Sequence, residues 1–438
     1  MLESFRPHAL PVAEDDANAV SVPDPQPFAA ARPAIPDRRQ FLRTLALGAL
    51  GTLGAPMILK GRCRLMAAPA AAPIDISTRA LDLVLGSTVI DMLGLLTLDW
   101  QKLFRWHRDP SAFVEADFRK LQASGIHVFH PAVEPSEPEA HGAALRWLGD
   151  WRRLLHGHGC FFTRIESVSD LLVVPKQKRI GVLMGFQNSS HFRTVADVEA
   201  FYGLGQRVSQ LTYNARNRLG YGCLEKTDRG LTPFGADIVG AMNRTGMTID
   251  VSHCGERTSL EAIAASRRPV LVTHSNCRAL VHHARCKSDQ VIRLLAAGGG
   301  VMGITMVRAF VSFRPAPTIE DLLDHFDHIA KLVGPEHVGI GSDVDVEAAD
   351  PRTGRTRAEY DIRGLHPATR VFQLAEGLLR RGYSERDTEL VLGGNFLRVL
   401  TETWPEDSWA PSPERELARD PFCPLPEPPP SATGAARS

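Results

Sequence analysis

The stretch GMTIDVSHCGERTSLEAIAASRRPVLVTHSN, residues 246–276, holds two short apolar runs with a helix pattern between them. The helix pattern stops before Pro269, because a proline disfavours helical backbone in the residue that precedes it. Short apolar runs that alternate with helices are typical of a parallel sheet whose faces are covered by helices. Each run ends in a histidine, His253 in the first and His274 in the second. The stretch therefore predicts a β/α unit with one histidine at the carboxyl end of each strand.

Apolar runs of the same kind recur along the chain, separated by helix patterns with recognisable ends. Thr232 and Pro233 open one helix pattern and Gly246 ends it, as expected of an N-cap, a first-turn proline and a C-cap glycine. Thr318 opens another pattern, with Asp321 three residues later. Eight apolar runs are found, at residues 87–93, 125–133, 179–186, 207–213, 246–253, 269–275, 299–305 and 336–343.

Eight strand–helix units predict an α/β fold of the (β/α)8 TIM-barrel type. The units extend over about 300 residues, and such a barrel usually takes about 250 residues plus insertions. An open doubly wound sheet is the alternative, but no glycine-rich phosphate loop follows the first run, at 87–93. We predict that the barrel domain covers residues 74–405.

The segments outside this domain have a different composition. Residues 1–36 are rich in Pro, Ala and acidic groups and residues 406–438 are rich in Pro, which predicts a disordered extension and a disordered tail. Within 37–73, Arg38 and Arg39 precede a weakly apolar run and then small residues. This order predicts a twin-arginine export signal, recognised by the export machinery, and a periplasmic or membrane-associated protein. The run is short for a membrane span of about 20 residues. The alternative is an amphipathic or anchoring helix in which the arginine pair occurs by chance.

Charge and cysteine content exclude two classes of protein. The 438 residues include 50 Lys and Arg and 50 Asp and Glu, so the formal net charge is zero and a nucleic-acid partner is not expected. The seven cysteines are dispersed without a CxxC pair, which argues against a disulfide framework.

Polar residues gather at the predicted strand ends, where a barrel of this type carries its active site. Neutral imidazoles of His253 and His274, at the ends of successive strands, can share one divalent ion, for which zinc is the best match. Asp343 is placed to take a proton from water whose pKa the metal lowers to about 7. Arg285 is placed to anchor a substrate carboxylate. Together these groups suit hydrolysis of a small amide. The alternatives are structural histidines, a capping role for Asp343 and a surface position for Arg285.

The motifs around these residues resemble the membrane (renal) dipeptidase family of zinc peptidases over residues 87–403. The matching motifs are DVSHCGERT at 250–258, VTHSNCRAL at 272–280, Arg285 with Asp289, HVGIGSDVD at 337–345 and LGGNFLRVL at 392–400. The resemblance implies a metallo-dependent hydrolase barrel with two zinc ions at the strand ends and hydrolysis of dipeptides. It also implies that His253 and His274 bind the second zinc, that Arg285 binds the substrate carboxylate and that Asp343 is the catalytic acid/base.

The sequence departs from the family pattern at several site positions. Leu93 and Leu95 stand where the family has a histidine and an aspartate ligand, and Gln187 replaces the bridging glutamate. Tyr213 replaces a histidine that contacts substrate. Leucine cannot bind zinc, and glutamine is a weak neutral ligand. We therefore predict one zinc ion per chain rather than two, held by His253 and His274 with help from Gln187.

These departures leave more than one function open. The leading prediction is a metal-dependent, dipeptidase-like hydrolase of dipeptides or similar small amides, with Tyr213 and Asn188 beside the substrate. The alternatives are an inactive homologue that binds a small peptide, or a mononuclear hydrolase of a lactam or N-acyl group. The resemblance is also compatible with a homodimer.

Overall fold

The computed structural model describes the backbone of residues 57–59 and 62–65 and both backbone and side chains of residues 74–135, 138–350, 353–354 and 356–405. The predicted extension at 1–36, most of the predicted export signal at 37–73 and the predicted tail at 406–438 lie outside the described residues.

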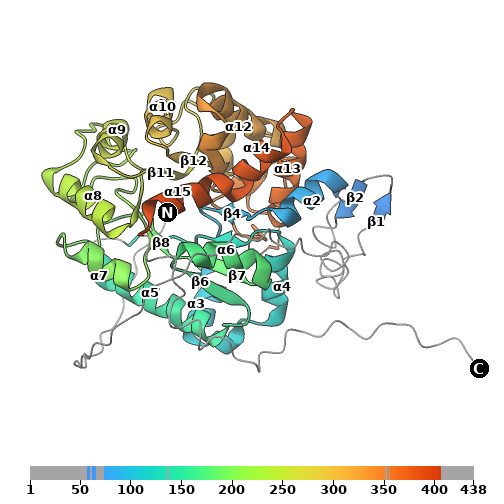
Figure 1. Ribbon diagram of the computed structural model, residues 1–438, viewed down its shortest axis with the longest axis horizontal. Helices are drawn as coiled ribbons and strands as arrows, with labels where there is room; N and C mark the ends of the chain where they lie inside the picture. The colour runs from blue at the N-terminus through green and yellow to red at the C-terminus, as the bar shows by residue number, and fades with distance from the viewer. Residues whose placement is uncertain are drawn as a thin grey trace, which may run out of the picture. The chain divides into compact units, whose positions relative to one another are not determined.

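A parallel sheet forms the centre of the protein, and helices surround it (Figure 1). Its strands are paired in the order β6-β7-β5-β4-β13-β12-β11-β10-β9-β8. Their bounds are Ile90–Asp91 (β4), Val128–Phe129 (β5), Phe162–Ile165 (β6), Ile180–Leu183 (β7), Gly185–Phe186 (β8), Val208–Gln210 (β9), Thr248–Asp250 (β10), Leu271–Ser275 (β11), Val301–Ile304 (β12) and Val338–Ile340 (β13).

The sheet closes on itself through β7 and β8. Only Met184 separates these two segments, so they form one interrupted strand. Its first part pairs with β5 and its second part with β9, which joins the two ends of the strand order. The segments β7 and β8 count as one strand of the ring, and β6 lies outside it. The ring then has eight strands, and each strand lies within one of the eight predicted apolar runs. The predicted (β/α)8 barrel is confirmed.

The strand β6 is an addition that the sequence analysis did not predict. It pairs with β7 on the side opposite β5, over four residues from Phe162–Ile180 to Ile165–Leu183. Thr163 and Arg164 interrupt its apolar pattern, and so the segment FTRI does not stand out as a buried strand.

Helices cover the outside of the ring and end where the sequence predicts. Thr232 accepts a hydrogen bond from the backbone of Gly235 at the start of α8, and Gly246 adopts a φ of 81° at its end. Thr318 and Asp321 form a capping box on α12. The longer helices are Thr78–Gly86 (α2), Trp100–Arg108 (α3), Glu115–Ala123 (α4), Ala140–Gly157 (α5), Val168–Gln177 (α6), Asp197–Gly203 (α7), Pro233–Thr245 (α8), Glu256–Ala265 (α9), Asp289–Ala297 (α10), Ile319–Val333 (α12), Arg370–Arg380 (α13) and Asn395–Thr403 (α15).

Shorter helical segments complete the chain. They are the α-helices Arg308–Val311 (α11) and Glu385–Glu389 (α14), the 3-10 turns at Pro110–Ala112, Pro335–His337, Ala358–Tyr360 and Pro367–Thr369, and a π-helical turn at Leu390–Gly394. The π-helical turn leads directly into α15, and the motif LGGNFLRVL extends over both.

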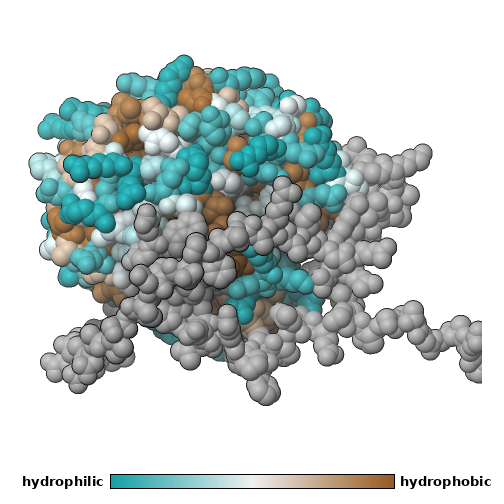
Figure 2. Space-filling view, viewed as in Figure 1, coloured by the Kyte–Doolittle hydropathy of each residue, from teal (hydrophilic) through white to brown (hydrophobic). Residues whose placement is uncertain are grey.

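A small antiparallel sheet precedes the barrel. It consists of Met57–Leu59 (β1), Arg62–Leu65 (β2) and Ile74–Ser77 (β3), paired in that order. Its first two strands fall within the segment predicted as an export signal. Among the described residues, no helix has the length and apolar character needed to cross a membrane. In the view of Figure 2, hydrophilic residues dominate the described surface and hydrophobic ones are scattered among them.

Candidate metal and hydrolytic site

Two histidines face each other where β10 and β11 end. The Nε2 atoms of His253 and His274 are 3.0 Å apart, and both side chains are buried. Burial lowers the pKa of each imidazole well below its ordinary value, and the nearby Arg285 guanidinium lowers both further. Both rings are therefore neutral at neutral pH, which is the form that binds a metal ion.

The other ring nitrogen of each histidine has an oxygen partner. His253 Nδ1 lies 2.7 Å from Asn214 Oδ1, and His274 Nδ1 lies 2.8 Å from Thr273 Oγ1. The Thr273 hydroxyl donates to Asp250 Oδ2 at 2.7 Å, so its oxygen accepts the proton of His274 Nδ1. The hydrogen-bond network thus assigns a proton to Nδ1 of both rings and leaves a lone pair on each Nε2.

This arrangement fits a cation. Two lone pairs 3.0 Å apart repel each other, and a positive ion bound by both Nε2 atoms removes that repulsion. Zinc is commonly bound by imidazole nitrogens whose other nitrogen donates to a second group. His253 and His274 therefore have the donor atoms and the tautomers of a metal-binding pair.

Other residues occupy the remaining ligand positions that the family resemblance implies. Leu93 and Leu95, at two of these positions, are buried. Gln187 donates from its amide nitrogen to Ala132 O at 3.1 Å, and its role as a ligand stays a prediction. Within the described part of the chain, no group of three or more His, Cys, Asp and Glu residues is arranged to hold a metal ion.

Asp343 follows β13 in a backbone conformation that is rare for a residue with a side chain. Its φ is 61°, and its amide donates to Leu93 O at 2.9 Å. The pKa of its carboxyl is about 7, mainly because burial raises it. The guanidinium of Arg285 lowers this pKa, and the carboxylate of Asp91 raises it. A carboxyl with this pKa can both accept and release a proton at neutral pH, as a general acid/base must.

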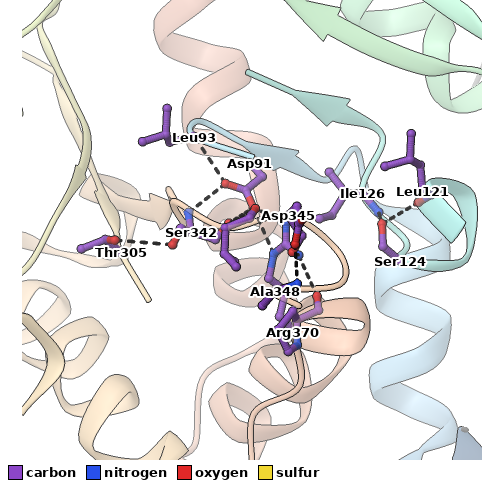
Figure 3. A network of polar contacts seen from close by, with 12 residues as sticks. Asp91, Leu93, Leu121, Ser124, Ile126, Thr305, Ser342, Asp345, Ala348 and Arg370 are labelled. Atoms are coloured by element: carbon purple, nitrogen blue, oxygen red, sulfur yellow. Dashed lines mark hydrogen bonds and ion pairs between the residues drawn. The ribbon is translucent and has the colours of Figure 1, made fainter. Parts of the chain in front are cut away.

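A buried ion pair holds the turn that carries Asp343 (Figure 3). Arg370 donates to Asp91 Oδ2 from Nε at 3.2 Å and from Nη2 at 3.0 Å, and both side chains are fully buried. Ser342 donates to the same carboxylate from its amide at 2.8 Å and from its hydroxyl at 2.6 Å. Arg370 Nη1 also donates to Asp345 O at 3.0 Å. The pair thus fixes the backbone on both sides of Asp343.

Arg370 was not identified from the sequence. It lies at the start of α13, far along the chain from Asp91, and no local motif marks it. Asp91 is the last residue of β4, and its carboxylate binds Arg370 and Ser342.

Arg285 is buried rather than on the surface, which excludes the alternative of a surface cation. Its Nη1 donates to Ser252 O at 2.7 Å and its Nη2 donates to His274 O at 2.6 Å, so it bridges the ends of β10 and β11. Its buried Nε has no hydrogen-bond partner among the described residues. The guanidinium therefore keeps donor capacity beside the histidine pair.

Tyr213 links the histidines to an open pocket. Its ring stacks on that of His253 with centroids 4.1 Å apart and planes inclined by 19°. Burial raises the pKa of the phenol well above its ordinary value, and the carboxyl groups of Asp343 and Glu134 raise it further, so the phenol stays protonated. The pocket has a volume of about 590 Å³ and is lined by Glu134, Asn188, Ser190, Tyr213, Ala215, Arg216, Asn217 and Arg218. This volume is in the usual range for small-molecule sites.

Asn188 lies in the wall of this pocket, near the predicted substrate position. It donates from Nδ2 to Glu134 Oε1 at 3.3 Å and accepts from Asn217 Nδ2 at 2.8 Å. Glu134 was not identified from the sequence. It follows the short strand β5 in the segment VEPSEPE, where several acidic residues share the same surroundings and none stands out.

Comparisons with known proteins identify the family of this chain. A family model described as Membrane dipeptidase (peptidase family M19) matches residues 78–408. Dipeptidase 3 of Rattus norvegicus is 30% identical over 248 residues, which are 55% of this chain and 49% of that protein. Dipeptidase verJ of Clonostachys rogersoniana is 32% identical over 281 residues, which are 63% of this chain and 68% of that protein. The chain thus spans about half the length of the rat relative.

Solved structures show the same fold. An amidohydrolase from Pseudomonas aeruginosa aligns with a TM-score of 0.65 and 28% identity over 74% of this chain and 99% of that one. A metallo peptidase from Rhodobacter sphaeroides, bound to a phosphinate mimic of the dipeptide L-Ala-D-Ala, aligns with a TM-score of 0.61 and 20% identity over 73% of this chain and 99% of that one. The predicted family and barrel fold are confirmed.

Proposed function

Because this chain belongs to the membrane dipeptidase family, we propose that it hydrolyses dipeptides or similar small amides with the help of one bound metal ion. The observation that carries this proposal is the histidine pair, whose two Nε2 lone pairs converge at 3.0 Å. A single zinc ion per chain, held by His253 and His274, agrees with the leucines at positions 93 and 95. When bound, such an ion polarises a substrate carbonyl and lowers the pKa of water.

Asp343 moves the proton in this proposal. In its charged form it accepts a proton from water as the water oxygen attacks the amide carbon. In its protonated form it gives that proton to the amide nitrogen, and the carbon–nitrogen bond breaks to release an amine and a carboxylic acid. A pKa of about 7 serves both steps, because the carboxyl then exchanges its proton readily at neutral pH.

Arg285, Tyr213 and Asn188 orient the substrate. Arg285 has an unpartnered Nε beside the histidine strands, which supports a role in binding the substrate carboxylate. Tyr213 keeps its phenolic proton and can donate it to the carbonyl oxygen, where negative charge develops. Asn188 lines the pocket in which the remainder of the substrate would lie.

The activity can be tested with purified protein, loaded with zinc and supplied with a panel of dipeptides. The proposal predicts hydrolysis that requires the metal and that falls by at least about 100-fold in Asp343→Asn, since a positioned acid/base contributes about that much or more. Equal rates in Asp343→Asn and the wild type would contradict the assignment of Asp343. No cleavage of any dipeptide by the zinc-loaded wild type would contradict the proposed function itself.

The proposed location is the periplasm or the membrane surface, reached through the twin-arginine pattern in residues 37–73. Arg38 and Arg39 support this proposal. In a bacterium with a twin-arginine system, cell fractionation should find the full chain outside the cytoplasm. The variant Arg38→Lys/Arg39→Lys should stay in the cytoplasm, and an unchanged distribution would contradict the proposal.

A further inference from the structure

Among the described residues, no cationic side chain forms an ion pair with the half-buried carboxylate of Glu134. Its described hydrogen bond comes from the neutral amide of Asn188, at 3.3 Å. No ion pair to Glu134 is formed within the part of the chain that the structure describes, although Arg216 and Arg218 line the same pocket. Burial raises the pKa of Glu134, and the Asn188 amide is the one group that opposes this increase. A cationic group of a ligand beside this carboxyl would stabilise its charged form.

Glu134 also lies at the reacting end of the pocket. Glu134 and Tyr213 line the same pocket, together with Asn188, which is hydrogen-bonded to Glu134. Tyr213 in turn stacks on the metal-binding candidate His253. A substrate that extends from this pocket to the histidine pair would therefore have Glu134 at one end and, at the other, Arg285, which donates to Ser252 O and His274 O.

We infer that Glu134 binds the free α-ammonium group of the substrate and selects dipeptides over N-acylated amides. This inference rests on the proposed function, since it assigns the second charged terminus of the same substrate. A dipeptide carries a carboxylate at one end and an ammonium at the other, and Arg285 and Glu134 are complementary to that pair of charges. An N-acyl group would leave the Glu134 carboxylate desolvated and without a cation, which disfavours binding.

Asn188 is a positioning residue in this arrangement. Its Oδ1 accepts hydrogen bonds from Ser190 N at 3.2 Å and from Asn217 Nδ2 at 2.8 Å, which fixes the amide plane. Its Nδ2 is thereby directed to Glu134, and the carboxylate keeps one oxygen for the ligand. Glu134 is thus held in place without being neutralised.

The test compares alanyl-alanine with its N-acetyl derivative in the zinc-loaded wild type and in Glu134→Gln, Glu134→Asp and Glu139→Gln. Glu139 lies a few residues along the chain and is exposed, which makes its variant a matched control. In Glu134→Gln the KM for alanyl-alanine should rise by about 10-fold at similar kcat, as expected for loss of one charged contact at a partly exposed site. The ratio of kcat/KM for alanyl-alanine to kcat/KM for its N-acetyl derivative should fall by the same factor. Glu134→Asp, which keeps the charge, should retain most of the preference, and Glu139→Gln all of it.

Calorimetric binding of alanyl-alanine separates failure of this inference from failure of the proposed function. Cleavage by the wild type with an unchanged KM and preference in Glu134→Gln would overturn the inference and leave the function standing. Binding without cleavage, weakened about 10-fold in Glu134→Gln, would support the inference and overturn the function. Neither binding nor cleavage by the wild type would overturn both.

Discussion

The imidazoles of His253 and His274 meet at 3.0 Å through their Nε2 atoms, while the Nδ1 atom of each ring has an oxygen partner. Two successive strands of the barrel deliver these rings, and Asn214 and Thr273 set their tautomers. In the proposed function the two Nε2 atoms bind the metal ion, and Asn214 and Thr273 orient the rings without touching it. The following predictions test this site and the residues that support it.

Asn214 should control metal affinity through the tautomer of His253. In Asn214→Leu the His253 Nδ1 proton loses its acceptor, so the ring can move its proton to Nε2 and lose the lone pair that binds the ion. Changes of this kind typically weaken metal binding by about 10- to 100-fold. Zinc titration with a competing chelator measures the effect. Asn214→Asp keeps an acceptor at this position and should bind zinc at least as tightly as the wild type; similar affinities in all three proteins would count against the tautomer argument.

Asp343 should make the stability of the metal-free protein depend on pH. Folding raises the pKa of its carboxyl from 3.8 to about 7, so the folded protein holds this proton more tightly than the unfolded protein does. The contribution of this group to stability is therefore fully present below about pH 4 and is lost as the pH rises through 7. In denaturant unfolding, Asp343→Asn should become more stable relative to the wild type as the pH increases over this range. A difference in stability that does not vary with pH would contradict the raised pKa.

The same carboxyl should govern the pH dependence of the reaction. In the proposed mechanism hydrolysis requires the charged form of Asp343 in the free enzyme, so kcat/KM should rise with pH through the pKa of this group. A bound metal ion near the carboxyl would lower this pKa below its value of about 7 in the metal-free protein. The residual activity of Asp343→Asn should lack this rise. A rise of the same shape in both proteins would assign the titration to another group.

Removal of Arg370 should destabilise the barrel strongly. Arg370→Met leaves the Asp91 carboxylate buried without its cation, and changes of this kind cost about 3–5 kcal/mol. Arg380 offers a matched control on the same helix, since it pairs with Glu320 at the exposed surface. Arg380→Met should change stability by less than about 1 kcal/mol. Chemical denaturation measures the free energy of unfolding of both variants. Equal losses of stability would show that the buried ion pair stabilises the fold no more than the exposed pair does.

Much of the barrel could be predicted from the sequence, because its strands are short apolar runs bounded by glycine, proline or charge. The helix ends at Thr232, Gly246 and Thr318 were predicted correctly, since caps depend on residues that are close in the chain. The strand β6 was missed because Thr163 and Arg164 break its apolar pattern. Strand pairing through β8 is a long-range property that local patterns do not contain.

The site was predictable where the strand order alone brings residues together. His253 and His274 end neighbouring strands, so their proximity follows from the fold. Arg370 and Glu134 could not be found in this way, because a helix start and a strand-to-helix loop reach the site through tertiary packing. The burial of Arg285 could not be predicted either, because its hydrogen-bond partners are the backbone carbonyls of Ser252 and His274, which no sequence motif marks.

The central claim is that His253 and His274 together hold one metal ion. The most direct measurement is the zinc content of protein folded in zinc-supplemented medium, for the wild type and for His253→Ala/His274→Ala, with His282→Ala as an exposed control. We predict about one zinc per chain in the wild type and in the control, and none in the double variant. Zinc retained by the double variant, or absent from the wild type, would contradict the account.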